Sequence, residues 1–202
     1  MKKIGLMRKL NISKSGAYQG TNFGHLTKPG FASALVTLLK KLNISSVTDL
    51  GCGTGSYVWV LRNSGINAYG FDGNPETSKL DTSRGHCIGP VDMTSQQSWN
   101  ETDAAMSIEV AEHIPAHLEA AFLKNLVNSA RRLIILTWAV PGQGGEGHVN
   151  GQTTKDVEEK MKKLGWRKNV EHTFFLQDNA QTYIKRNVQV FEKCDSWEEC
   201  IP

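Results

Sequence analysis

The chain has 202 residues, of which 39% are hydrophobic and 21% charged. This is enough apolar material for a sizeable core, so the composition excludes an intrinsically disordered protein. Its 23 Lys and Arg against 20 Asp and Glu give a formal net charge of +3, too small by itself to indicate nucleic-acid binding. No apolar run approaches the ~18 residues that span a bilayer, and no apolar segment follows the basic start. We therefore expect a cytoplasmic protein without membrane contact.

Residues 1–30 are polar and glycine-rich and show no clean periodicity. We expect them to form an N-terminal arm or lid that either folds over a bound cofactor or packs against a sheet edge. Its candidate side chains for the first role are Tyr18, Phe23 and His25. At about 150 residues per domain, residues 31–202 are expected to form one domain. Apolar side chains at helical spacing predict that it begins with a helix over residues 31–42.

After that helix, short apolar runs alternate with helical segments. The runs predict strands at residues 47–50, 68–71, 87–91, 104–108 and 133–138, and the segments predict helices at 57–63, 116–128 and 154–164. Strands that alternate with helices imply right-handed crossovers and a mostly parallel sheet. Residues 170–176 and 187–191 instead predict two strands with no helix between them, an antiparallel hairpin that closes one edge. The fold class is α/β, with a Rossmann-like, doubly wound sheet.

The segment Asp49-Leu50-Gly51-Cys52-Gly53-Thr54-Gly55 directly follows a predicted strand and precedes a predicted helix. Its glycines allow backbone N–H groups to approach a ligand closely at a helix N-terminus. Asp72 ends the next predicted strand, where a carboxylate can accept both hydroxyls of a ribose. Asp92 ends the third strand and is followed by Met93, which offers an apolar wall for an adenine ring. Together these residues predict a nucleoside site.

The glycine spacing distinguishes between nucleoside cofactors. A dinucleotide fingerprint would need glycine at position 56, where the chain has Ser56, which disfavours a nicotinamide-dependent oxidoreductase. No Gly-Lys-Ser or Gly-Lys-Thr follows, so a P-loop is excluded. A Gly-x-Gly-x-Gly loop preceded by Asp49 suits a ligand that lacks a pyrophosphate and carries a cationic amino group.

These residues, together with Glu109-Val110-Ala111-Glu112-His113, resemble the class I S-adenosylmethionine-dependent methyltransferases from about residue 47 to 191. The resemblance implies a seven-stranded sheet whose last strand is antiparallel, and S-adenosylmethionine as cofactor. It implies that the glycine loop binds the methionine part, Asp72 the ribose, and Asp92 with Met93 the adenine. The cofactor-binding residues expected on this basis are Asp49, Gly51, Cys52, Gly53, Gly55, Asp72, Gly73, Asp92, Met93 and Glu109.

A second group of polar residues, Glu109, Glu112 and His113, follows the fourth predicted strand. Two interpretations remain open. In one, Glu109 contacts the cofactor region while Glu112 and His113 cap the helix that begins near Pro115. In the other, all three hold a divalent cation such as Mg²⁺ or Mn²⁺ together with His148 from a glycine-rich loop.

The metal interpretation resembles the Glu-x-x-Glu-His plus distant His arrangement of metal-dependent O-methyltransferases. Such enzymes act on adjacent hydroxyls and include small-RNA terminal ribose methyltransferases and ubiquinone-pathway enzymes. By the same resemblance, the missing Asn-Pro-Pro-Tyr motif argues against methylation of amide or adenine nitrogens. A sugar hydroxyl is a weak acid that needs a base or a metal before it can attack the methyl group. The expected catalytic residues are Glu112, His113 and His148.

We therefore predict an O-methyltransferase acting on a vicinal diol of a sugar or glycan, assisted by a divalent metal. The acceptor is expected to be a small molecule or glycan rather than a nucleic acid. The loop over residues 141–150 and the chain size are similar to a rhamnose-methylating domain that follows glycosyltransferase domains in a chlorella-virus fusion protein, so this chain could belong to a longer polypeptide. The alternatives are a metal-independent O-methyltransferase for a catechol or quinone precursor, an NAD-dependent oxidoreductase, and an inactive cofactor-binding module.

The chain has four cysteines, Cys52, Cys87, Cys194 and Cys200, and no Cys-x-x-Cys pair. Cys194 and Cys200 could pair or contribute to a metal site, but two thiols do not complete a zinc site. We expect all four to be reduced thiols.

Overall fold

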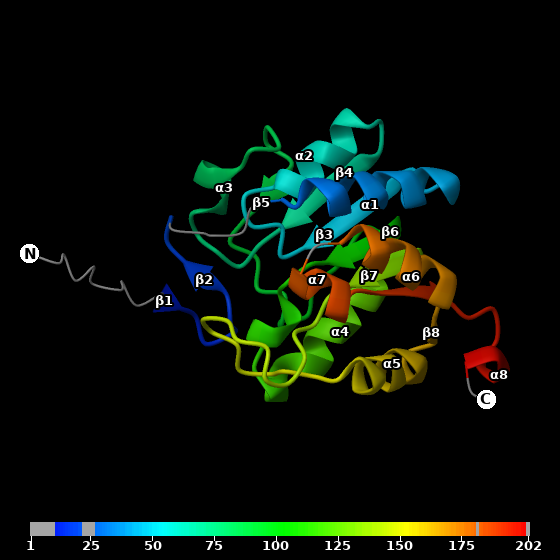
Figure 1. Cartoon of the computed structure of the whole chain (residues 1–202). Helices are drawn as coiled ribbons and strands as arrows, with labels where there is room; N and C mark the ends of the chain where they lie inside the picture. Colours follow the sequence, from blue (N-terminus) through cyan, green and yellow to red (C-terminus); the bar gives the residue numbers. More distant parts are fainter. Residues whose placement is uncertain (1–10, 22–26, 181, 201–202) are drawn as a thin grey trace, which may run out of the picture.

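The computed structural model describes residues 11–21, 27–180 and 182–200, and within them seven strands form one sheet (Figure 1). From one edge to the other the strands are β5 (Cys87–Ile88), β4 (Asn67–Phe71), β3 (Ser46–Leu50), β6 (Thr102–Ser107), β7 (Ala130–Leu136), β9 (Gln189–Lys193) and β8 (Trp166–Lys168). The first five pair in parallel, and β9 runs antiparallel to both of its neighbours. The predicted doubly wound, mostly parallel sheet is confirmed.

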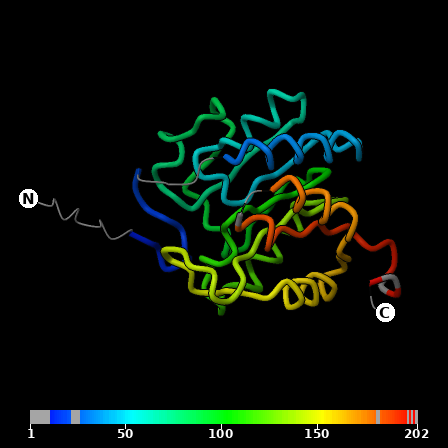
Figure 2. Tube along the Cα trace, in the orientation of Figure 1, coloured from blue at the N-terminus to red at the C-terminus, as the bar shows by residue number. Residues whose placement is uncertain are grey.

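Side chains alternate between the two faces of the sheet, and each face has its own core. In β6 and β7, Met106 and Ile135 join one core while Ala105 and Ile134 join the other, as the period of two along a strand requires. The first core is covered by α1 (Pro29–Lys41), α2 (Ser56–Asn63), α6 (Val170–Asn179) and α7 (Thr182–Asn187). The second is covered by α4 (Glu119–Asn128) and α5 (Thr154–Lys163) (Figure 2). Helices therefore cover both faces.

Short elements complete the connections. The helix predicted over residues 116–128 begins as a 3₁₀ turn, η2 (Ala116–Leu118), before α4, and another 3₁₀ turn, η1 (Ala111–His113), lies just upstream. A separate hairpin consists of β1 (Asn11–Ile12) and β2 (Tyr18–Gln19). The remaining helices are α3 (Thr77–Leu80) and α8 (Trp197–Cys200). None of the helices in the described ranges has the length and hydrophobicity needed to cross a membrane.

The prediction for the C-terminal hairpin is wrong in one of its two strands. Residues 170–176 form most of α6, and the strand that pairs with β9 is β8. The run of β-branched and aromatic side chains suggested a strand, but the Asn169 side chain caps a helix by accepting from the His172 N–H at 2.8 Å. Thr173 and Leu176 are buried on one side of this helix, whereas Phe174 is 58% exposed. Tertiary burial at helical spacing therefore overrides the local strand preference.

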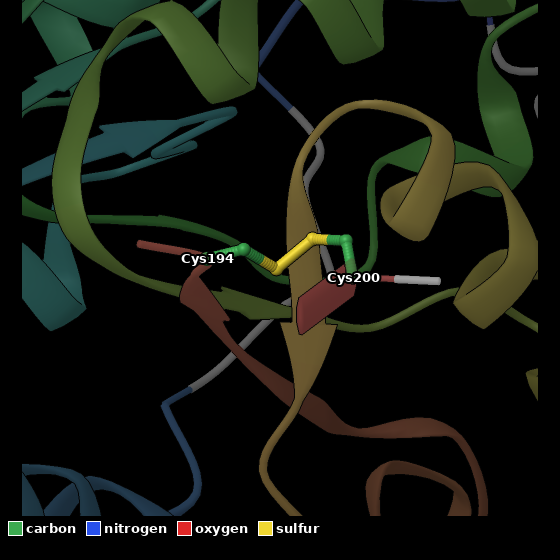
Figure 3. The surroundings of a disulfide bond; sticks show 2 residues. All are labelled: Cys194 and Cys200. Atoms are coloured by element: carbon green, nitrogen blue, oxygen red, sulfur yellow. A yellow bond between two sulfur atoms is a disulfide. The ribbon is translucent and has the colours of Figure 1, made fainter. Parts of the chain in front are cut away.

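The expectation of four reduced thiols is also wrong, because Cys194 and Cys200 form a disulfide (Figure 3). The Cys194 N–H donates to the Gly165 carbonyl at 3.0 Å beside the β8–β9 pair, and α8 turns the chain back. This brings the two Cα atoms to 5.9 Å, within the range for a disulfide. Cys52 and Cys87 are reduced and buried, as expected.

Candidate active site

The glycine loop follows β3 and leads into α2 at the carboxyl edge of the sheet. Its three glycines have positive φ angles, and at two of them the space is also closed to a side chain. A Cβ atom on Gly51 would lie 2.2 Å from Val110 Cγ2, and one on Gly55 would lie 2.7 Å from Asp81 Oδ1. At Gly53 the space is open, and its N–H donates to Asp72 Oδ2 at 2.8 Å. Gly51 and Gly55 thus have no room for a side chain, whereas the space beside Gly53 is open.

One cavity collects most of the residues predicted to bind the cofactor. It lies where β3, β4 and β6 end, because the carboxyl ends of parallel strands share one edge of the sheet. Gly55 does not line it and instead begins α2. The predicted residues that do line it are Asp49, Gly51, Cys52, Gly53, Asp72, Gly73, Asp92, Met93 and Glu109.

The inner wall of the cavity has a pair of carboxyl groups. Asp49 is 2% exposed, and burial together with the nearby Asp72 raises its pKa to about 8. Burial also raises the pKa of Asp72, although the N–H groups of Asn74 and Gly53 partly offset that effect. A cationic ligand group beside Asp49 would restore its negative charge. The cavity therefore favours a ligand with an ammonium group at this end.

At the other end, Asp92 and Met93 follow β5. Asp92 is exposed, and its Oδ1 accepts from the N–H and the hydroxyl of Thr94 at 2.9 and 2.7 Å. Met93 is buried, and its carbonyl accepts from the Asn125 side chain at 2.7 Å. Helix α4 thereby fixes the segment that we expected to form the adenine wall.

Glu112, His113 and His148 form the second part of the site. One potential ligand atom from each residue lies within 4.8 Å of the others, and we call these three residues the EHH cluster. Glu112 is fully buried, and among the described residues no group meets either of its carboxylate oxygens with good hydrogen-bond geometry. Burial, followed by the charge of Glu109, raises the pKa of Glu112 to about 8, while the nearby backbone N–H groups of Glu112 and Ala139 lower it in part. A buried carboxylate without a partner is destabilising unless a cation or a proton meets it.

The two imidazoles of the EHH cluster are oriented by backbone carbonyls. Nδ1 of His113 lies 3.1 Å from the Gly147 carbonyl, and Nδ1 of His148 lies 3.2 Å from the Gln143 carbonyl. When Nδ1 donates, the lone pair is on Nε2, and Nε2 of His148 is 3.8 Å from Glu112 Oε1. A carbonyl that fixes the tautomer in this way is the usual support of a metal-ligating histidine. The donor set fits a divalent cation.

The loop that carries His148 is attached to Glu112 through its backbone. The N–H groups of Val149 and Asn150 donate to the Glu112 carbonyl at 2.9 and 3.0 Å. The capping interpretation is not supported, because neither η2 nor α4 has a side-chain cap at its N-terminus. Of the EHH cluster only His113 lines the cavity, so it is the member in reach of a bound acceptor.

Glu109 lies outside the EHH cluster, although we expected it among the metal ligands. Its backbone has a φ of +58°, its N–H donates to the Thr137 hydroxyl at 2.6 Å, and its Oε1 accepts from Asn187 Nδ2 at 3.1 Å. A positive φ in a residue other than glycine costs about 1–3 kcal/mol. The hydrogen bonds with Thr137 and Asn187 hold Glu109 in this conformation at the cavity wall, outside the EHH cluster.

The N-terminal arm reaches the cavity, which agrees with one of its two expected placements, and Tyr18, one of the side chains expected to face the cofactor, lines it. Sequence reasoning missed Ser15, Gly16 and Ala17 of the same hairpin, together with Lys28, Tyr57 and Tyr183. None of these six residues belongs to a motif that indicates its place in the fold. Phe23 and His25 are outside the described residues.

Comparisons with known proteins identify the family and the fold of this chain. A family model described as a methyltransferase domain matches residues 24–182. Similar structures include the magnesium protoporphyrin IX methyltransferase of Synechocystis PCC 6803 with bound SAH (TM-score 0.63, 16% identity, covering 85% of this chain and 90% of that chain). The sugar N-methyltransferase KedS8 from Streptoalloteichus sp ATCC 53650 has a TM-score of 0.68, with 13% identity over 87% of this chain and 96% of that chain.

The methyltransferase domain of bacterial CtHen1 is also similar (TM-score 0.60, 19% identity, covering 81% of this chain and 96% of that chain). None of the curated protein sequences compared with this chain matches it significantly. At these identities the structural likeness shows the fold alone, whereas the family model spans most of the chain. The chain therefore belongs to the methyltransferase-domain family and has the fold of the class I S-adenosylmethionine-dependent methyltransferases.

Proposed function

We propose that this S-adenosylmethionine-dependent methyltransferase transfers its methyl group to a hydroxyl of a vicinal diol on a sugar or glycan, with a divalent cation held by the EHH cluster. The observation that carries the proposal is Glu112. It is fully buried, its two oxygens lack a well-aligned hydrogen-bond partner within the described part of the chain, and His148 Nε2 lies 3.8 Å from its Oε1. A cation at this point would satisfy the carboxylate and draw on the imidazole lone pairs.

The chain's own residues orient the cofactor. Asp49 receives the amino group of the methionine part, and Lys28, which lines the cavity, supplies positive charge for its carboxylate. Asp72, fixed by the N–H groups of Gly53 and Asn74, binds the ribose, and Met93 packs against the adenine. The sulfonium is already an activated donor, so alignment of the hydroxyl oxygen, methyl carbon and sulfur contributes most, up to ~7–11 kcal/mol.

As the new oxygen–carbon bond forms, the bond between the methyl carbon and the sulfonium sulfur breaks, S-adenosylhomocysteine leaves, and the acceptor hydroxyl gives up its proton to water. A cation held by Glu112, His113 and His148 would lower the pKa of that hydroxyl. His113 is the cluster member that lines the cavity, and its Nδ1 is held by the Gly147 carbonyl. Its ring therefore keeps one orientation toward the acceptor. Glu112, which is fully buried, and His148, which is partly buried, do not line the cavity and would hold the cation from the side away from the acceptor.

The charge of the cavity supports a neutral acceptor. Four lining residues are acidic, namely Asp49, Asp72, Asp92 and Glu109, and Lys28 is the one lysine or arginine among the described residues that line it. The lining formed by the described residues thus lacks the clustered positive charge on which binding of a phosphate backbone relies. A sugar, a glycan or a catechol does not rely on such charge.

A second candidate is a metal-independent O-methyltransferase in which His113 is the general base. One observation favours it. The Gly147 carbonyl lies 3.1 Å from Nδ1, and the Tyr18 oxygen lies 3.3 and 3.4 Å from the two ring nitrogens. Two oxygen acceptors beside one imidazole suit a ring that has taken up a proton.

The test measures methyl transfer from S-adenosylmethionine to catechol and to a rhamnoside after treatment with a chelator and readdition of Mn²⁺ or Mg²⁺. The proposal expects activity to return with the ion and to fall at least ~100-fold in Glu112→Gln, as for loss of a metal ligand. His117→Ala, an exposed histidine of η2 outside the cavity lining, is the matched control and should keep full activity. Full activity in the chelated protein would support the metal-independent candidate, and no transfer to either diol would contradict both.

A further inference from the structure

The N-terminal hairpin of β1 and β2 does not join the main sheet and lies at its carboxyl edge. Its strands pair Asn11 with Gln19 and Ile12 with Tyr18. Ser13 closes the turn, because its hydroxyl accepts from the Ala17 N–H at 3.0 Å and its own N–H donates to the Ala17 carbonyl at 2.8 Å. Figure 2 shows this blue hairpin beside the yellow loop that follows β7. The hairpin is therefore an ordered unit with its own hydrogen bonds.

One side of the hairpin contacts the turn of Asp72, Gly73 and Asn74. We call the part of the cavity beside this turn the adenosyl half, because the proposed function places the ribose of the cofactor there. Asn74 Nδ2 donates to the Gly20 carbonyl at 2.9 Å, and the Gly20 N–H donates back to Asn74 Oδ1 at 3.3 Å. The Asn74 N–H in turn donates to Asp72 Oδ1 at 2.8 Å. A Cβ atom on Gly73 would lie 2.5 Å from the Ala17 Cβ, so the hairpin packs directly on this turn. Any ligand that fixes the Asp72 turn also fixes this side of the hairpin.

The other side of the hairpin contacts the EHH cluster. The ring of Tyr18 meets His113 edge to face, with the centroids 4.9 Å apart, and the Tyr18 oxygen lies 3.3 Å from Nδ1. The Tyr18 hydroxyl donates to the Glu146 carbonyl, in the loop that carries His148. A Cβ atom on Gly147 would lie 2.5 Å from Ile12 Cδ1. The hairpin therefore contacts both segments that supply the histidines.

We propose that Tyr18 is a positioning residue for the EHH cluster. In this proposal, a ligand bound in the adenosyl half restrains the hairpin, and the hairpin in turn restrains the loop that carries His148. This inference rests on the proposed function for its catalytic meaning, but its contacts do not depend on the acceptor. The hairpin is hydrogen-bonded to Asn74 on one side and to Glu146 on the other, so a ligand that restrains the Asp72 turn also restrains the hairpin and, through it, the loop.

The first experiment measures hydrogen exchange with and without S-adenosylhomocysteine. The reporters are the N–H groups of Val149 and Asn150, which donate to the Glu112 carbonyl. In the wild type, ligand binding should slow their exchange about tenfold, the effect expected from one net hydrogen bond. In Tyr18→Phe, which keeps the ring but removes the hydroxyl, the slowing should fall below about threefold, while affinity for the ligand changes less than about threefold.

Asn11→Ala is the matched control. It removes only the exposed hydrogen bond from Asn11 to Gln19 within the same hairpin and should preserve the full slowing of exchange. Equal slowing in wild type and Tyr18→Phe, both folded by their melting curves, would overturn the inference. An equal loss of the slowing in Tyr18→Phe and Asn11→Ala would also overturn it, because the slowing would then depend on the stability of the hairpin and not on Tyr18.

The second experiment titrates Mn²⁺ against methyl transfer. In Tyr18→Phe the half-saturating Mn²⁺ concentration should rise about 10-fold or more, as when the support of a metal ligand is removed. The KM for S-adenosylmethionine should change less than about threefold. Unchanged Mn²⁺ dependence in Tyr18→Phe would contradict the positioning role. A wild type without any Mn²⁺ dependence would refute the proposed metal site instead, and hydrogen exchange would then decide on the hairpin by itself.

Discussion

Binding of the cofactor should release a proton from Asp49. With a pKa of about 8, this buried carboxyl is about 90% protonated in the free protein at pH 7. The ammonium group of S-adenosylhomocysteine needs the ionised form, so each binding event at pH 7 should release about 0.9 proton from this group. Apparent affinity should then rise with pH, about tenfold from pH 6 to 7 and about fivefold from pH 7 to 8.

The assay is isothermal titration calorimetry at pH 7 in buffers that differ in ionisation enthalpy, since the slope of heat against that enthalpy counts the protons. Asp49→Asn should remove the release and flatten the pH dependence. Glu112→Gln is the control, because this carboxyl has a similarly raised pKa but does not line the cavity. Proton uptake in the wild type, or release that survives in Asp49→Asn, would refute the reasoning.

The remaining predictions concern stability. Gly51→Ala should lower the free energy of unfolding by about 3 kcal/mol or more, because the new Cβ would meet Val110 at 2.2 Å and the φ is +94°. Gly53→Ala has open space and should lose only about 1–2 kcal/mol from its positive φ; urea unfolding of both compares them, and equal losses would contradict the packing argument. Replacing Cys194 and Cys200 by serine should cost about 2 kcal/mol for so short a loop, a fall of roughly 4–8 °C in melting temperature. An unchanged melting temperature would mean that the C-terminal segment unfolds separately.

The expected site residues that the structure brings to one cavity are mainly those that follow strand ends. Gly53, Asp72 and Asp92 each follow a parallel strand, so the topology alone brings them to one edge. His148 could be placed for the same reason, since its loop follows β7 and lies beside the turn after β6. Local hydrophobic patterning identified the strands, and their parallel arrangement in the sheet brings the residues that follow them close together.

The parts that were missed depend on contacts between segments distant in sequence. Tyr18 meets His113 across 95 positions, and Asn187 meets Glu109 across 78. Neither side chain belongs to a motif, and Asn187 was expected at the start of a strand, whereas in the structure it ends α7 and the strand begins at Gln189. Glu109 was grouped with Glu112 because they are three residues apart, but its positive φ turns it toward Asn187 instead. The backbone conformation of Glu109 thus explains why it lies outside the EHH cluster.

Two buried carboxyl groups, Asp49 and Glu112, have pKa values raised to about 8, and in both the main cause is burial while the next is another carboxylate. A carboxyl whose pKa is raised on folding stabilises the protein below its unfolded pKa of about 4, and this contribution is lost as pH rises through 8. The free protein should therefore lose stability between pH 5 and 8. A cationic ligand at Asp49 and a metal ion at Glu112 would each reverse that trend, because each supplies the positive charge that the chain does not. Ligand binding and the stability of the fold are then linked through these two carboxylates, because Asp49 would pair with the ammonium group of the cofactor and Glu112 with the metal ion.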